Sequence, residues 1–337
     1  MSAASTLVPA RHRVRWATRT SRATALVGAV LLIGLAFLPL WGSSGQMRLL
    51  IEFFGLLAMA QMWNLLAGYG GLVSIGQQAF VGIGAYGLFI FTDLAGLPVI
   101  PAIACMAAAA VVIAIFTSVF AFRLRGGYFA IGTWVIAEIF RIIVSNVREL
   151  GVGTGVTIQS LVRMPAAERL ELTYWMALAV GFGSIVLVTL VMRSRLGLAL
   201  AAIRDSEVAA GGLGVNVLRT KRIVYVIASV GCAIAGAVLY VQLLRIQPLA
   251  AFSVDWTVKM IFIVVIGGLG RIEGPIIGAV IFIAMRETLA DLGVAYLIAL
   301  GLFMVVIVLL APRGIWGLLT SRWPIALFAI RRRLVTR

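Results

Sequence analysis

The 337-residue sequence is 62% hydrophobic and 12% charged, with a mean hydropathy of +1.10. Soluble domains are roughly 45–50% apolar, so this composition excludes an ordinary soluble domain and indicates a polytopic membrane protein. The formal charge of +16 does not predict nucleic-acid binding, because the basic residues lie in short loops and at both ends instead of forming one basic face.

The chain begins with a basic segment, 1–22, that carries five arginines ahead of a long apolar run. The run ends at Trp41 and Gly42 without the small-residue cleavage site of a signal peptide, which predicts an uncleaved first span. A hydrocarbon core about 30 Å thick requires roughly 20 apolar residues of helix. Charges, Gly and Pro divide the sequence into ten candidate spans: 24–41, 48–67, 73–92, 98–122, 127–148, 172–193, 222–245, 256–269, 274–290 and 293–311. We therefore expect an all-α fold of about ten transmembrane helices with Gly-rich broken or re-entrant segments.

The positions of Lys and Arg predict the orientation of these spans. With the N-terminus inside, ten spans return the C-terminus inside; 20 basic residues then face the cytoplasm, five face outside and three lie within spans. The expected organisation is a cytoplasmic tail at 1–22, a transmembrane domain at 23–318 and a basic cytoplasmic tail at 319–337. Two loops are long: 149–171, on the outside, and 193–222, on the inside.

The inside loop contains apolar residues at the spacing of a short amphipathic helix, namely Leu196, Leu200, Ile203 and Ala210. Such a helix can lie against the membrane face, where a soluble partner could grip it.

Residues 82–87 (GIGAYG) match the G-x-G-x-x-G pattern of dinucleotide-binding proteins. That pattern requires a preceding strand and an acidic residue about 20 positions later. Here it lies in an uncharged apolar run, and Asp93 follows by only six positions. Close helix packing explains Gly82, Gly84 and Gly87 better.

A helix break is expected at Gly70, Gly71 and Gly76, because lipid would penalise the polar residues beside them. A second Gly-rich stretch, with Gly267, Gly268 and Gly270, repeats the letters GGL of the first. Paired interrupted helices are typical of transporter repeats, although a pattern this short also arises by chance in apolar sequence.

The sequence contains no site for chemistry of its own. The only lysines, Lys221 and Lys259, do not follow glycine, so a phosphate-binding P-loop is absent and any ATP must be hydrolysed by another subunit. Cys105 and Cys232 lie in apolar runs and the sole histidine is His12, so neither a metal site nor a Ser-His-Asp triad is expected. We predict no catalytic residue, metal or cofactor.

An ion-coupled secondary carrier, the main alternative, would require unpaired ionisable residues deep in spans. The membrane-depth charges instead stand at helical pairing distances. Glu138 precedes Arg141 by three residues, and two further pairs at four-residue spacing are expected near span ends: Arg48 with Glu52, and Asp255 with Lys259.

Five ordered motifs resemble the M-type permease subunits of branched-chain amino acid ABC importers, over about residues 50–318. The motifs are 64–80 (NLLAGYGGLVSIGQQAF) with 82–86 (GIGAY), 123–131 (RLRGGYFAI) with 138–139 (EI), 202–210 (AIRDSEVAA) with 213–215 (LGV), 265–270 (VIGGLG) with 274–275 (GP), and 312–318 (PRGIWGL). The resemblance implies a complex in the bacterial inner membrane with a second homologous permease, two cytoplasmic ATP-binding subunits and an external solute-binding protein.

The resemblance also implies roles for individual residues. The inside loop is similar to the motif with which importers couple to their ATPases, which assigns this role to Arg204, Glu207, Ala210 and Gly214. Polar groups at membrane depth are predicted to line the solute pathway: Asn64, Ser74, Gln77, Gln78, Tyr128 and Thr133.

Two departures from the family pattern leave the solute open among branched-chain amino acids, other amino acids, urea and amides. The stretch 151–155 reads GVGTG where relatives often have T-G-G-x-x-G, and Gln77 stands where relatives often have His or Tyr.

Overall fold

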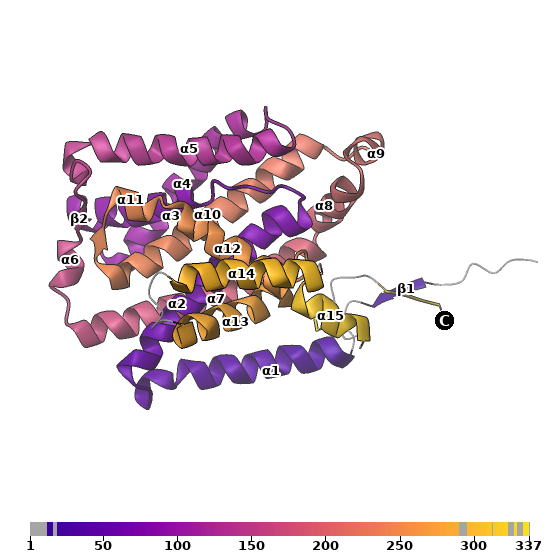
Figure 1. The fold of residues 1–337 in the computed structure, drawn as a ribbon, viewed down its shortest axis with the longest axis horizontal. Helices are drawn as coiled ribbons and strands as arrows, with labels where there is room; N and C mark the ends of the chain where they lie inside the picture. Colours follow the sequence, from indigo (N-terminus) through magenta and orange to yellow (C-terminus); the bar gives the residue numbers. More distant parts are fainter. Residues whose placement is uncertain are drawn as a thin grey trace, which may run out of the picture.

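The computed structural model describes residues 12–15, 19–289, 295–311, 313–322, 327–328 and 333–336. The protein is a polytopic all-α membrane protein (Figure 1). Eight helices within these residues are long and apolar enough to cross a membrane, so the expected count of ten spans is not confirmed. They are Ala23–Leu40, Ser44–Tyr69, Val99–Ala121, Gly127–Asn146, Ala166–Arg193, Val217–Leu243, Pro248–Gly267 and Ile298–Thr320. Much of the two predicted tails, 1–22 and 319–337, lies outside the described residues.

The long helices follow one another along the chain with short connections. Their bounds are α1 Arg19–Ala36, α2 Ser44–Asn64, α3 Gln78–Phe89, α4 Val99–Ala121, α5 Gly127–Asn146, α7 Ala166–Arg193, α10 Val217–Leu243, α12 Val254–Gly267, α13 Glu273–Leu289 and α14 Ala295–Leu310. Two of them continue as π-helical turns: α2 through Leu65–Tyr69 and α3 through Ile90–Leu94.

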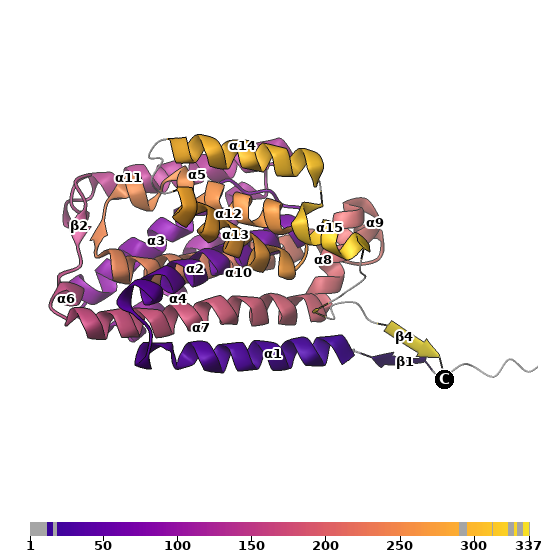
Figure 2. The same cartoon turned by 60° about the horizontal axis from the view of Figure 1, so that its bottom comes forward.

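Shorter elements complete the fold. The helices are α6 Gln159–Val162, α8 Arg195–Asp205, α9 Glu207–Gly212, α11 Pro248–Ala251 and α15 Gly314–Arg322, with 3₁₀ turns at Leu38–Leu40 and Arg148–Leu150. The antiparallel strand pairs are β1 His12–Arg15 with β4 Arg333–Thr336, and β2 Val156–Thr157 with β3 Arg245–Ile246. Figures 1 and 2 place α8, α9, α15 and β1 at one end of the helices, and α6 and β2 at the other.

Helix α2 forms the centre of the bundle. Every residue from Phe54 to Asn64, and every residue of the following turn Leu65–Tyr69, is buried. A helix that is apolar on all sides is stable in this position because other helices surround it; α7, α10, α12 and α13 all pack against α2. The outer helices α1, α4, α5 and α14 instead present many apolar side chains outward, as expected of lipid-facing spans.

Glycines allow α3 and α10 to pack closely, as the sequence predicted for the 82–87 stretch. A methyl group on Gly84 would lie 3.0 Å from the backbone nitrogen of Ala237, and one on Gly236 would lie 2.7 Å from the carbonyl oxygen of Val81. Gly87 likewise faces Met106 of α4. Residues 82–87 are internal to α3 and not at a strand-to-helix turn, so they do not form a dinucleotide site.

Two of the three expected ion pairs are confirmed. Arg141 Nε donates to Glu138 Oε1 at 2.8 Å, and Lys259 Nζ lies 2.7 Å from Asp255 Oδ2. The pairing of Glu52 with Arg48 is wrong: Glu52 forms its ion pair with Arg286. Packing of α13 on α2 brings this arginine across from the glutamate.

Candidate functional site

The chain is not helical between the π-helical turn that extends α2 and the start of α3. The π-helical turn Leu65–Tyr69 ends at Gly70, and regular helix resumes only at Gln78. Gly71 has a φ of +66°, which favours glycine. At Gly76 the backbone lies so close to Thr133 of α5 that an added methyl group would be 2.8 Å from Thr133 Cβ. We call the segment 70–77 the first break.

A second interruption separates α12 from α13. Helix α12 ends at Gly267 and α13 begins at Glu273, with φ values of +135° at Gly268 and +72° at Gly270. We call the segment 268–272 the second break. The glycines named from the sequence therefore lie at the ends or within these two non-helical segments.

Side chains of α2 hold the second break in place. Asn64 Nδ2 donates to the carbonyl oxygen of Arg271 at 2.8 Å, and the Gly270 N–H donates to Asn64 Oδ1 at 2.8 Å. Gln61 Nε2 donates to the carbonyl oxygen of Ile272 at 2.8 Å. Both ends of the Asn64 amide therefore bind backbone groups of the second break, which gives this predicted pathway residue a structural contact.

The first break gathers polar side chains from three elements. The hydroxyl of Thr133 accepts from the Ile75 N–H at 3.2 Å, and the hydroxyl of Thr257 accepts from the Gln78 N–H at 3.3 Å. The Thr257 hydroxyl also donates to Gln78 Oε1. Ser74 lies in the same group, since its hydroxyl accepts from the Gly76 N–H at 3.2 Å.

Gln77 differs from its neighbours because neither end of its amide has a hydrogen-bonding partner among the described residues. The side chain is fully buried, as is that of Gln78, whose Nε2 also has no partner there. Burying an amide without a hydrogen bond costs roughly 1–3 kcal/mol on protein scales. The first break therefore contains polar groups that are not committed to holding the fold.

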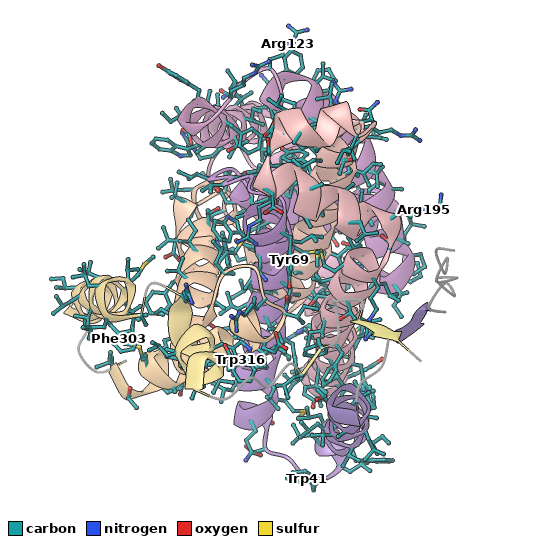
Figure 3. The ribbon with its side chains drawn as sticks, turned by 90° about the vertical axis from the view of Figure 1, so that its right-hand side faces the viewer. Trp41, Tyr69, Arg123, Arg195, Phe303 and Trp316 are labelled. Atoms are coloured by element: carbon teal, nitrogen blue, oxygen red, sulfur yellow. The ribbon has the colours of Figure 1, made fainter. Side chains whose placement is uncertain are left out.

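The structure brings together Ser74, Gln77, Gln78 and Thr133, and adds Thr257, which sequence reasoning missed. The sequence does show a threonine inside the apolar α12, but it does not show that this residue pairs with Gln78, which is 179 positions away. Tyr128 lies apart, 75% exposed at the start of α5. Tyr69, at the end of the π-helical turn, is labelled near the centre of the bundle in Figure 3.

Helices α8 and α9 lie in the predicted inside loop 193–222, and we call residues 194–216, between α7 and α10, the end hairpin. Ser194 caps α8, with the Leu196 N–H donating to its hydroxyl at 3.1 Å, and Ser206 caps α9, with the Ala209 N–H donating at 3.3 Å. Gly214, with a φ of +83°, follows α9.

The end hairpin contacts both breaks through α8. A methyl group on Gly70 would lie 3.7 Å from Leu200 Cδ2, and one on Gly270 would lie 2.9 Å from Arg204 Nη1. Ala210 of α9 is buried, whereas Val208 of the same helix and Leu213, just after its end, are 88% and 82% exposed. Glu207 forms an ion pair with Lys221 of α10.

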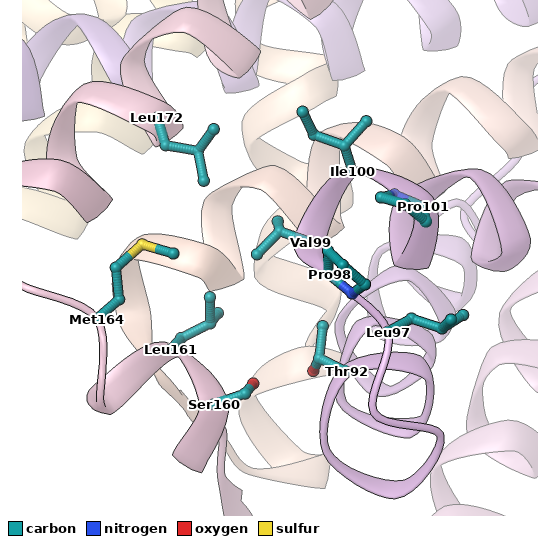
Figure 4. Close-up of a pocket in the computed structure, with 10 residues that line it drawn as sticks. All are labelled: Thr92, Leu97, Pro98, Val99, Ile100, Pro101, Ser160, Leu161, Met164 and Leu172. Atoms are coloured by element: carbon teal, nitrogen blue, oxygen red, sulfur yellow. The ribbon is translucent and has the colours of Figure 1, made fainter.

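A cavity of about 330 Å³ lies at the opposite end of the bundle, beside α6 (Figure 4). Its wall is mostly apolar, and none of its lining residues is charged: Thr92, Leu97, Pro98, Val99, Ile100, Pro101, Ser160, Leu161, Met164 and Leu172. Asp93 fixes the adjoining turn by accepting from the N–H groups of Gln159 at 2.6 Å and Ser160 at 3.0 Å. The cavity contains none of the predicted pathway residues.

Taken together, a helical bundle with two broken helices in its core and a hairpin that contacts both breaks defines a membrane-embedded protein of the polytopic all-α class. The family described as "Branched-chain amino acid transport system / permease component" matches residues 46–311, and the chain belongs to this family.

Two curated relatives are similar to the chain. The high-affinity branched-chain amino acid transport system permease protein LivM of Escherichia coli (strain K12) is 27% identical over 281 residues, which cover 75% of this chain and 65% of that protein. The protein of the same name from Salmonella typhimurium is 26% identical over 316 residues, covering 85% and 73%. The chain thus spans about two thirds of the length of these relatives. No solved structure matches it.

Proposed function

We propose that this chain is the transmembrane permease subunit of an ABC importer in the bacterial inner membrane, and that it passes a branched-chain or related amino acid across the bilayer by alternating access. Support comes from the family match and from the names of the two relatives. The structural observation that carries the proposal is the contact of α8 with both Gly-rich breaks, because it joins a peripheral hairpin to the polar centre of the bundle.

In this proposal the end hairpin faces the cytoplasm, together with both chain termini, and docks on a separate ATP-binding subunit. The exposed apolar side chains of Val208 and Leu213 fit a groove on such a partner. Movement of α8 would then reach the breaks through Leu200 and Arg204. The complete assembly comprises a second homologous permease, two ATP-binding subunits and an external solute-binding protein.

The first break supplies the solute pathway. Ser74, Gln77, Gln78 and Thr133 are closed off in the structure described here, and alternating access would expose them in turn to the two sides of the membrane. Tyr128, at the start of α5 on the cytoplasmic side, belongs to the exit of the same pathway. The chain performs no chemistry in this mechanism; its polar groups offer hydrogen bonds, and the ATP-binding subunits supply the energy.

The first test is purification of the tagged chain from native membranes, followed by mass spectrometry of the co-purified proteins and assay of leucine uptake in proteoliposomes. We expect a second permease and an ATP-binding subunit, and uptake that requires ATP. Ion-driven uptake by the chain alone would support the secondary carrier instead. That alternative is not favoured, since Glu52 and Glu138 are both paired with arginines.

A further inference from the structure

Helix α5 carries an ion pair in the middle of its length. Glu138 and Arg141 are the twelfth and fifteenth of the 20 residues of Gly127–Asn146, so about 12–18 Å of helix separates Glu138 from either end. Both Nε and Nη2 of Arg141 donate to a single oxygen, Oε1, of Glu138. Among the described residues, no other group is paired with these two side chains.

This pair is exposed although it lies at mid-span. The side chain of Glu138 is 46% exposed and that of Arg141 is 29% exposed. Helix α5 lies at the edge of the bundle (Figure 1) and packs mainly through Phe129, Thr133 and Ala137, which leaves the flank with the ion pair uncovered.

Hydrocarbon is an unfavourable environment for this flank. A charged residue at the centre of a helix costs about 2.5–3.5 kcal/mol on insertion scales. Glu138, about 12 Å of helix from the nearer end, is too deep for its side chain to reach the interface, whereas Arg141 is closer, about 7.5 Å from Asn146. Trp134 and Ser145 extend the same flank at helical spacing, and Trp134 is 47% exposed. Helix α14, by contrast, exposes only apolar side chains among its described residues, as a lipid-facing helix should: Ile298, Leu302, Val305, Val306, Val308, Leu309 and Leu310.

The two charges match the head group of an α-amino acid. Such a solute carries a carboxylate and an ammonium on one carbon. The guanidinium of Arg141 has further N–H donors in a planar fork suited to a carboxylate, and Glu138 Oε2 remains free to accept from an ammonium. We propose that, in the assembled importer, Glu138 and Arg141 bind the zwitterionic head of the amino acid as it passes along α5 toward the first break, which Thr133 of the same helix contacts; this inference rests on the function proposed above.

Exchanging the two charges distinguishes recognition of the solute by this pair from simple neutralisation of one side chain by the other. The double variant Glu138→Arg with Arg141→Glu retains an ion pair of the same spacing but reverses its direction along α5. In the assembled importer, with its ATP-binding subunits and binding protein in proteoliposomes, we expect uptake of radiolabelled leucine to fall about tenfold or more, the effect of losing a charge-assisted hydrogen bond. Wild-type uptake by this variant would overturn the inference.

The matched control is the other intrahelical pair, Asp255 with Lys259, near the start of α12. The swap Asp255→Lys with Lys259→Asp should leave uptake within about twofold of wild type, since exposed pairs contribute little. If the wild-type importer takes up no amino acid, the proposed function fails together with this inference. If leucine enters and both swaps transport normally, only the recognition role fails.

A labelling experiment tests the same inference in a variant that needs no transport. In a Cys105→Ala background, Glu138→Cys in the assembled importer should react with a water-soluble methanethiosulfonate reagent, and leucine with its binding protein should slow the reaction. Ile139→Cys, one residue away on another face and also exposed in the isolated chain, serves as the lipid-facing control and should stay unreactive. Equal, leucine-independent behaviour of the two positions would overturn the inference.

Discussion

The two Gly-rich breaks have similar sequences but differ in how their polar groups are used. The second break, at 268–272, is tied to α2 by hydrogen bonds between its backbone and the side chains of Asn64 and Gln61. The first break, at 70–77, contains Gln77, whose amide is buried with no partner among the described residues. Both breaks are anchored, since Trp63 Nε1 of α2 donates to the Ser74 carbonyl oxygen at 2.9 Å, but the first break in addition keeps the Gln77 amide without a partner. A shared sequence pattern thus predicts where helices stop, and the neighbouring helices decide what each interruption can do.

The largest effect is expected from Asn64→Ala. This change leaves the Gly270 N–H and the Arg271 carbonyl oxygen without their side-chain partner. Losing these bonds should lower the free energy of unfolding by about 2–5 kcal/mol, measured as a drop in the apparent Tm of the detergent-purified protein.

The matched control is Asn146→Ala, because Asn146 Nδ2 donates to the Ile142 carbonyl oxygen of its own helix, in an exposed position. This variant should keep the wild-type Tm. An equal loss in both variants would mean that the second break is not specially fixed by α2.

A smaller effect on stability, with the opposite sign, is expected for Gln77→Leu. Replacing an unpaired buried amide with an apolar side chain of similar size should raise the free energy of unfolding by about 1 kcal/mol. Uptake by the assembled importer should fall sharply, because the uncommitted amide is lost from the pathway. The apparent Tm and leucine uptake would be measured on the same preparation; a lower Tm would show that Gln77 is a structural residue like Asn64.

The smallest stability change is expected for Glu207→Arg on α9. The Glu207 side chain is 57% exposed, so loss of its pairing with Lys221 should change the free energy of unfolding by less than about 1 kcal/mol. In the proposed function this variant inserts normally but hydrolyses ATP without importing solute. ATPase activity and uptake would be measured together. The control is Glu168→Arg, in the first turn of α7, which lies far from α9 at the other end of the bundle. Coupled, wild-type transport by Glu207→Arg would remove Glu207 from the coupling contact.

Hydropathy located most of the helices but not all of their limits. The predicted span 172–193 is the end of α7, which begins at Ala166, because Glu168, Arg169 and Glu171 lower the hydropathy of its first turns. The predicted span 73–92 begins too early: apolar Leu72, Val73 and Ile75 belong to the first break and not to α3. Burial makes a sequence apolar whether its backbone is helical or extended, so hydropathy alone does not separate the two.

The site shows the same limit in its pairwise contacts. Local spacing identified Glu138 with Arg141 because both lie on one helix. It assigned Glu52 to the wrong arginine and missed Thr257, because Arg286 and Gln78 reach these residues only through helix packing. Polar residues in an apolar sequence can be recognised individually, whereas their partners depend on the tertiary fold. A sequence-based description is therefore more reliable for which residues matter than for what they contact.

The central position of α2 also has a consequence in time. Asn64 and Arg271 are 207 residues apart, so at about 5–20 residues per second the ribosome needs about 10–40 s after making Asn64 to produce its partner. Helix α10 begins 153 residues after Asn64 (217 − 64), so for most of that interval α2 has been made and none of α10, α12 and α13 exists to surround it. The newly made helix must keep its two amides, Gln61 and Asn64, paired temporarily with water, lipid head groups or the biosynthetic machinery. The innermost helix of this bundle is therefore one of the first to be synthesised, and the helices that complete its enclosure are among the last.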